Sequence, residues 1–177
     1  FLFTGIRGVG KTTIARIIAM GLNCEKENKP IANPCGICSN CKAILQDRYE
    51  DVLEIDAASN TGVDDVREII SSLKYRPSKG SYKVFIIDEV HMLSNSAFNA
   101  LLKTIEEPPS FVKFIFCTTE MQKIPITIVS RCQKYNLNRV TLIALCNYLE
   151  TIVELEELDI SKEAIRVIAR NSEGSIR

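Results

Sequence analysis

The 177 residues of the chain have room for one medium domain, or for one domain with a small appendage. Hydrophobic residues make up 46% of the chain and charged residues 25%, as in an ordinary globular protein that buries a core. Lys plus Arg and Asp plus Glu balance at 22 each, so no net charge draws the whole chain to nucleic acid or to an anionic membrane. The apolar runs are too short to span a bilayer and no signal-peptide pattern is present, so we expect a cytoplasmic protein without a membrane partner.

Strand-like and helix-like segments alternate along most of the chain. We expect strands over 1–4, 51–56, 83–88, 112–117 and 133–137, and helices over 11–22, from residue 64 and over 94–106, with a polar turn over 58–62. Ser94 is the expected N-cap of the third helix. This alternation predicts an α/β fold with a parallel sheet covered by helices on both faces.

From residue 141 the pattern is entirely helical. We therefore expect a P-loop domain over 1–139, with an insertion over 23–42, and the beginning of a small helical domain over 140–177. The chain starts inside an expected strand and stops in mid-pattern, which indicates a piece of a longer protein.

A phosphate-binding motif lies between the first strand and the first helix. Residues 5–12 read Gly-Ile-Arg-Gly-Val-Gly-Lys-Thr, the P-loop pattern in its strand–loop–helix context. The glycines allow successive N–H groups to point at phosphate oxygens, and the following helix N-terminus favours negative charge. Lys11 is expected to reach the outer phosphates and Thr12 to bind Mg²⁺. The expected nucleotide-binding residues are Gly5, Gly8, Val9, Gly10, Lys11, Thr12 and Thr13.

Two acids end the apolar strand 83–88 in the manner of a Walker B motif. Asp88 is placed to hold Mg²⁺, and Glu89 to orient and deprotonate the attacking water. A strand that simply ends on a solvated turn is the alternative, and the upstream P-loop weighs against it. A glutamate directly after the aspartate favours an ATPase over a small-molecule kinase.

Four cysteines form the second chemical pattern. Cys24, Cys35, Cys38 and Cys41 include two overlapping Cys-x-x-Cys turns, and four thiolates suit a closed, structural zinc site. An iron–sulfur cluster is the main competitor, although the further cysteine that its motif expects is missing downstream. The odd total of seven cysteines weighs against disulfides.

Several polar residues stay ambiguous from the pattern alone. Thr118 and Thr119 follow the strand 112–117, where a hydroxyl can face the γ-phosphate or simply cap the strand. Arg131 and Arg177 read as surface charges when taken in isolation. His91, the only histidine, is most simply a polar residue at a strand-to-helix turn.

Taken together, these motifs resemble those of a known family. The P-loop, the four cysteines, Asp-Glu-Val-His at 88–91, Leu-Leu-Lys-Thr-Ile-Glu-Glu-Pro-Pro at 101–109 and Ser-Arg-Cys at 130–132 are similar to those of the AAA+ clamp-loader ATPases. The likeness is greatest to the gamma/tau subunits of bacterial DNA polymerase III. The related delta-prime subunits carry the cysteines without a working P-loop, whereas this chain has both.

The resemblance implies roles for the ambiguous residues. Arg131 would be an arginine finger that completes a neighbouring subunit's site in trans. Thr119, in preference to Thr118, would be sensor 1, and Arg177 would be sensor 2 in a helical lid.

The resemblance also implies a motor that uses ATP, with Mg²⁺ and structural zinc, and contains no polymerase activity itself. Its partners would be the delta and delta-prime subunits, further gamma/tau copies, a sliding clamp and primer–template DNA. Three rival functions are a non-hydrolysing assembly subunit, a zinc-dependent nucleic-acid-binding domain and a small-molecule kinase.

Overall fold

The computed structural model describes residues 1–59 and 62–177, so Asn60 and Thr61 of the expected polar turn lie outside the described residues. The chain divides into two compact units. The first contains residues 1–4 and 11–135, and the second contains residues 5–10 and 136–177. The division expected from the sequence, 1–139 and 140–177, stays a prediction.

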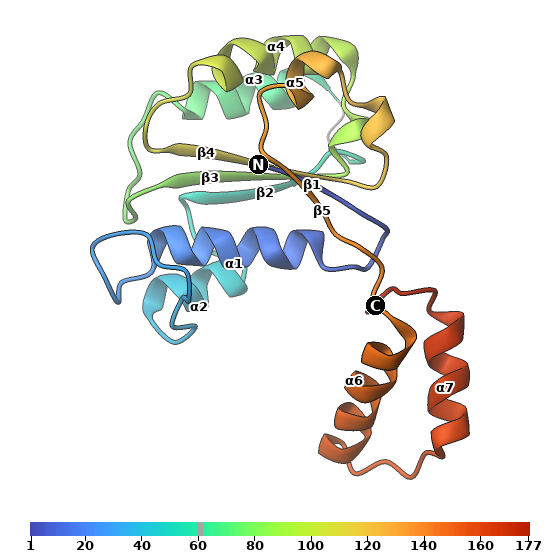
Figure 1. The fold of residues 1–177 in the computed structure, drawn as a ribbon. Helices are drawn as coiled ribbons and strands as arrows, with labels where there is room; N and C mark the ends of the chain where they lie inside the picture. Colours follow the sequence, from blue (N-terminus) through green and yellow to red (C-terminus); the bar gives the residue numbers. More distant parts are fainter. Residues whose placement is uncertain (60–61) are drawn as a thin grey trace. The chain divides into compact units, whose positions relative to one another are not determined.

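A five-stranded sheet in the order β2-β3-β4-β1-β5 forms the centre of the first unit (Figure 1). The neighbouring pairs β2–β3, β3–β4 and β4–β1 are parallel, as the alternating pattern predicted. The strands are β1 Leu2–Thr4, β2 Val52–Asp56, β3 Lys83–Asp88, β4 Val112–Thr118 and β5 Lys134–Asn136.

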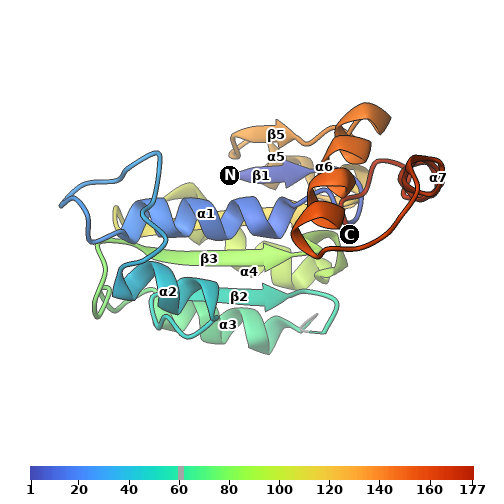
Figure 2. The same cartoon turned by 90° about the horizontal axis from the view of Figure 1, so that it is seen from below.

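Helices cover both faces of this sheet (Figures 1 and 2). One face carries α1 Lys11–Asn23, with α2 Ser39–Leu45 beside it, and the other carries α3 Val63–Ser72, α4 Asn95–Glu106 and α5 Ile126–Val129. Two 3₁₀ turns, η1 Val90–Met92 and η2 Met121–Lys123, follow β3 and β4. The Ser94 hydroxyl accepts the Ala97 N–H at 3.2 Å, which confirms the expected cap of α4.

The core lies between the sheet and the layer of α3 and α4. The strands β3 and β4 are apolar and buried on both faces, as expected for central strands of a parallel sheet. Their rings stack on one face, with centroids 5.5 Å apart for Phe85 and Phe114 and 5.9 Å apart for Phe114 and Phe116. These rigid central strands fix the positions of the polar residues that follow them.

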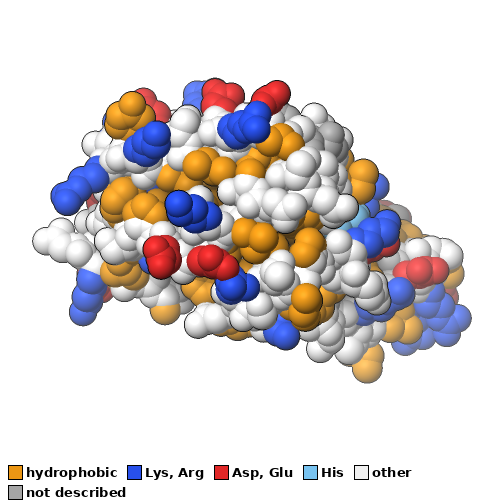
Figure 3. Space-filling model, turned by 90° about the horizontal axis from the view of Figure 1, so that it is seen from above, with side chains coloured by type: hydrophobic (Ala, Val, Ile, Leu, Met, Phe, Trp, Pro, Cys, Tyr) orange, Lys and Arg blue, Asp and Glu red, His pale blue; other side chains and the backbone are white. Residues whose placement is uncertain are grey.

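The outer surface of the α3–α5 layer mixes charges of both signs. Figure 3 shows Lys and Arg side chains on this face interspersed with Asp and Glu and with hydrophobic side chains. This mixture agrees with the equal totals of acidic and basic residues in the sequence. No helix of the described residues is long and apolar enough to cross a membrane.

Asp51, just before β2, anchors the loop that leads into β3. The side chain is buried, and its carboxylate accepts the backbone N–H groups of Ser78, Lys79 and Gly80 at 2.8, 2.9 and 3.0 Å. Burial raises the pKa of Asp51, but the three backbone donors together outweigh burial and leave the pKa below its ordinary value. The ionised carboxylate therefore stabilises the folded state.

Asp51→Asn is expected to lower the free energy of unfolding by about 2 kcal/mol at neutral pH, because charge-assisted hydrogen bonds are lost. A depressed folded-state pKa stabilises above the unfolded-state value of about 3.9, and this contribution is lost as pH falls through the folded-state pKa. Urea unfolding at neutral and acidic pH measures the difference, which should shrink in acid. Glu50→Gln, at the exposed neighbouring carboxylate, is the control and should change stability little.

The second unit contains the helical hairpin of α6 Leu142–Leu155 and α7 Lys162–Asn171, which confirms the expected helices. Thr141 and Ser161 cap them through hydroxyl groups that accept backbone N–H groups. Leu145, Ile165 and Ala169 are buried between the helices, whereas other positions of the apolar pattern, such as Leu142 and Ile168, are exposed. Two packed helices bury only the side chains that face each other, so apolar side chains on their other faces stay exposed.

Candidate active site and metal centre

The P-loop segment Gly5–Gly10 belongs to the second unit and joins β1 to α1 along the chain. Gly8 and Gly10 have φ values of 78° and 97°, in the left-handed region that a side chain disfavours. The motif therefore places glycine where the backbone requires it.

The end of the chain lies against this segment within the same unit. The Ile176 N–H donates to the Gly8 carbonyl oxygen at 2.9 Å. A Cβ atom on Gly8 would collide with the Ser175 hydroxyl and would lie 3.0 Å from the Arg177 Cβ. Arg177, the expected sensor 2 residue, is thus beside the P-loop backbone.

The first unit supplies the residues expected to bind Mg²⁺. Lys11 begins α1 and is buried, and Thr12 follows it. The Thr12 hydroxyl donates to Asp88 Oδ2 at 2.7 Å. Asp88 is the last residue of β3, so the structure brings together two residues 76 positions apart that were predicted to share one ion.

Glu89 is held in an unusual backbone conformation directly after β3. Its φ and ψ are both 44°, in the left-handed region that is uncommon for residues other than glycine. Its N–H donates to Asp88 Oδ1 at 2.9 Å. The Glu89 Oε2 atom accepts the N–H and the hydroxyl of Thr119 at 3.2 and 3.0 Å. Such outliers concentrate at functional sites, where surrounding contacts maintain them.

The two threonines after β4 have different surroundings. Thr119 is exposed and contacts Glu89, the candidate base. Thr118 is fully buried, with its hydroxyl oxygen 2.9 Å from His91 Nδ1. The assignment of Thr119 as sensor 1 stays a prediction, and Thr119 is the threonine that contacts Glu89.

Arg131, the expected finger, follows the short helix α5. Its guanidinium forms an ion pair with Glu106 at 2.5 Å and donates to the Thr127 carbonyl oxygen at 2.7 Å. The side chain is 37% exposed. These partners belong to α4 and α5, and they hold the guanidinium while the side chain stays partly exposed to a neighbouring molecule.

The four cysteines of the expected metal site converge. The Sγ atoms of Cys24, Cys35, Cys38 and Cys41 all lie within 4.8 Å of one another. A tetrahedral ion with Zn–S bonds of about 2.3 Å needs sulfur atoms about 3.8 Å apart. The Cys24 and Cys35 sulfurs are 3.6 Å apart, so the cluster fits such an ion.

Backbone donors support the thiolate form of this cluster. The Cys38 N–H donates to Cys35 Sγ at 3.3 Å, and the Cys41 N–H donates to Cys38 Sγ at 3.4 Å. The first of these bonds, with one from Ile37, lowers the pKa of Cys35 to about 6. Burial raises the pKa of Cys41 to about 12, so metal binding there must displace a proton.

Elemental analysis of the purified protein is expected to find about one zinc ion per chain and no iron, because four thiolates close a tetrahedral shell. Cys38→Ser should lose the metal and lower the melting temperature. Cys146→Ser is the matched control outside the cluster and should keep both. Iron with a visible absorption band would contradict zinc and support an iron–sulfur cluster.

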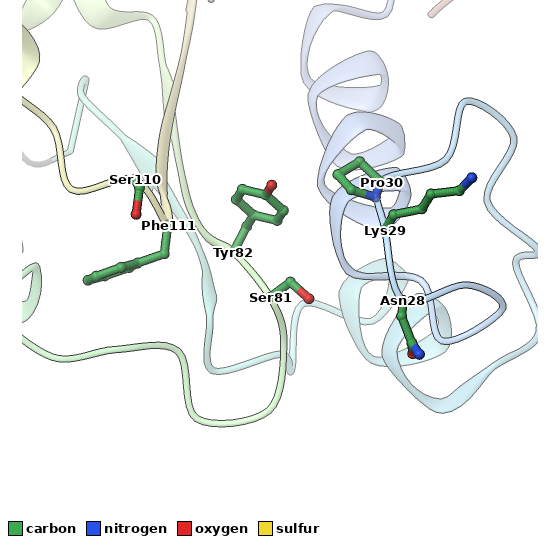
Figure 4. Close-up of a pocket in the computed structure, with 7 residues that line it drawn as sticks. All are labelled: Asn28, Lys29, Pro30, Ser81, Tyr82, Ser110 and Phe111. Atoms are coloured by element: carbon green, nitrogen blue, oxygen red, sulfur yellow. The ribbon is translucent and has the colours of Figure 1, made fainter.

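A cavity lies at the amino ends of β3 and β4, away from Asp88 and Glu89. It has a volume of about 420 Å³ and is lined by residues that include Lys29, Tyr82 and Phe111 (Figure 4). Tyr82 and Phe111 precede β3 and β4, at the amino ends of the strands, whereas Asp88 and Thr118 end them. Parallel sheets bind ligands at the carboxyl ends, so this cavity is not the expected nucleotide site.

Comparisons with known proteins agree with the pattern of motifs. Residues 1–141 match the family model described as "DNA polymerase III, delta subunit". Over all 177 residues the chain is 50% identical to DNA polymerase III subunit tau of Escherichia coli and 49% identical to subunit tau of Bacillus subtilis. It is 48% identical to subunit gamma of Buchnera aphidicola subsp. Baizongia pistaciae. The chain spans 27%, 31% and 47% of the lengths of these relatives.

Solved structures show the same fold at lower sequence identity. The RuvB Holliday junction branch migration motor of Thermotoga maritima matches with a TM-score of 0.65 and 20% identity, covering 99% of this chain and 50% of that one. A gamma subunit-related protein of the same organism matches with a TM-score of 0.50 and 22% identity, covering 93% of this chain and 58% of that one. The chain therefore shares its fold with these proteins, a parallel sheet flanked by helices, as the sequence predicted.

Proposed function

Since the chain belongs to the bacterial DNA polymerase III family that contains the tau and gamma subunits, we propose that it is an ATP-hydrolysing motor of a clamp loader. In this proposal ATP binding and hydrolysis drive the loading of a ring-shaped sliding clamp onto primed DNA. The chain spans about a quarter to a half of its relatives, so the remaining steps of loading belong to other segments and subunits.

The contact between Thr12 and Asp88 carries the ATPase proposal. The hydroxyl that follows the P-loop lysine and the acid that ends β3 meet at 2.7 Å, and Glu89 follows directly. Mg²⁺, when bound through Thr12 and Asp88, would neutralise charge on the transferred phosphoryl group. A non-hydrolysing assembly subunit would have no need for a carboxylate such as Glu89 directly after Asp88.

Each remaining residue has a defined task in hydrolysis. Lys11 and the P-loop N–H groups bind the phosphates of ATP, while Glu89 orients the attacking water and accepts its proton. Thr119 holds the Glu89 carboxylate, and Arg177 contacts the γ-phosphate from the helical lid. Arg131 acts on the site of a neighbouring subunit.

The expected partners follow from an active site that is completed by Arg131 of a neighbouring subunit. Neighbouring subunits of the delta, delta-prime and gamma/tau types supply or receive the finger, and the assembly binds the sliding clamp and primer–template DNA. The balanced charge of this chain favours DNA contacts that are shared among subunits. The cysteine cluster, occupied by zinc, has a structural role because four thiolates leave no position for water. The assembly works in the bacterial cytoplasm.

The test is an ATPase assay on the complete protein, alone and with candidate partner subunits, clamp and primed DNA. We expect slow turnover alone and strong stimulation by all components together. Glu89→Gln should bind ATP normally but lose about 10²–10⁴-fold in kcat, the usual contribution of a general base. Stimulated turnover that survives Glu89→Gln would reject Glu89 as the base, and ATP binding without turnover by the wild-type protein would support the assembly subunit instead.

A further inference from the structure

His91 is enclosed by polar groups, although it lies in the short turn η1. Only 6% of its side chain is exposed. Its Nδ1 atom is 2.9 Å from Thr118 Oγ1 and 3.4 Å from Glu89 Oε2, and its Nε2 atom is 3.3 Å from Glu120 Oε1. The sequence predicted a polar residue at a strand-to-helix turn, and η1 is such a turn; the structure adds polar partners at both ring nitrogens.

Both ring nitrogens of His91 lie beside polar groups of the turn that follows β4. Thr118 Oγ1 is within hydrogen-bond distance of His91 Nδ1 and also accepts the Glu120 N–H at 3.0 Å. On the other side of the ring, His91 Nε2 faces the Glu120 carboxylate. The ring therefore contacts the residues on both sides of Thr119.

The imidazole thereby fixes the turn from Thr118 to Glu120 at both ends. Thr119 lies between these two anchored residues and presents its N–H and its hydroxyl to Glu89 Oε2. A shift of this turn would move both donors away from the Glu89 carboxylate. The geometry of the candidate base thus depends on a side chain that lies two positions after it.

We propose that His91 is a positioning residue for ATP hydrolysis, which holds Glu89 in place through Thr118, Thr119 and Glu120. It touches neither ATP nor the attacking water. This inference rests on the proposed ATPase function and adds a supporting residue to the same site.

The primary test compares His91→Phe with His91→Gln in the complete protein within its assembly. His91→Phe keeps a planar ring and loses both nitrogens, so kcat should fall by about 100-fold, the cost of a small misplacement of a catalytic group. The affinity for ATP should change by less than about twofold, because the phosphate-binding residues are untouched. His91→Gln retains an amide N–H group that can reach Glu120, and it should recover part of kcat.

Two further variants separate positioning from folding. Thr118→Val removes the hydroxyl that links His91 to the turn, so it should lower kcat in a similar way. The double variant with His91→Phe should lose little more, since both changes break one network. Lys123→Met removes the exposed partner of Glu120 and should leave kcat close to the wild-type value. Melting temperatures report on folding, and Thr118→Val decides the matter if His91→Phe does not fold.

The outcomes distinguish this inference from the proposed function. Absence of ATP turnover in the wild-type assembly would overturn the proposed function. Wild-type turnover that Glu89→Gln abolishes, with unchanged kcat in folded His91→Phe and Thr118→Val, would overturn the role of His91 alone. Equal losses in ATP affinity and kcat would also overturn it, because they would place His91 in binding.

Discussion

Lys11→Ala is expected to abolish ATP binding. Lys11 begins α1 and is buried directly after the P-loop glycines, where its charge is the one that the motif directs to the outer phosphates. Alanine keeps the helix start, since it is a good helix former, and removes the ammonium group. Titration with a fluorescent ATP analogue should show saturable binding by the wild-type chain and none by the variant.

Thermal stability gives a second readout of the same change. ATP at about 100 times its Kd should stabilise the wild-type protein by about 2.7 kcal/mol, and should leave Lys11→Ala unchanged. Lys42→Ala, an exposed lysine in α2, is the matched control and should behave as the wild type. Undiminished ATP affinity in Lys11→Ala would remove the P-loop from the nucleotide site.

Residues close in sequence allowed most of the fold to be predicted. The apolar runs of β3 and β4, the serine cap of α4 and the spacing of the four cysteines are local patterns, and each has a direct physical cause. The contact between Thr12 and Asp88 was also predictable, because a parallel sheet brings the carboxyl ends of its strands to one edge.

The sequence did not reveal the contacts between side chains that are distant along the chain. Nothing local shows that His91 meets Thr118, 27 residues away, or that Arg131 pairs with Glu106. The short elements α5, η1 and η2 also escaped prediction, since three or four residues carry no periodic pattern. A lone histidine two positions after Glu89 was the one available signal for the network around Glu89.

The contacts of Arg131 could not be read from the sequence. They also leave the guanidinium able to act in trans, on the site of a neighbouring subunit. Within the chain its guanidinium has Glu106 and Thr127 as partners, and the side chain is partly exposed. An exposed ion pair of this kind contributes at most about 1 kcal/mol, so a neighbour's phosphate charge can compete for the guanidinium. Glu106 can thus orient the finger without retaining it.

Arg131→Ala is expected to leave ATP binding intact and to lower stimulated turnover by about 10³–10⁵-fold, the range of a missing arginine finger. Arg67→Ala, at an exposed arginine paired with Asp64 in α3, is the matched control and should retain turnover. Melting temperatures of both variants should stay near the wild-type value, since each loses one surface ion pair.

A mixing experiment shows which chain owns the finger. Assemblies made only of Glu89→Gln or only of Arg131→Ala should both be inactive. Mixed assemblies should regain part of the activity wherever an Arg131→Ala chain, with its own Glu89 intact, receives Arg131 from a Glu89→Gln neighbour. A finger acting in cis would leave every mixed assembly inactive, because each chain would then lack either its base or its arginine.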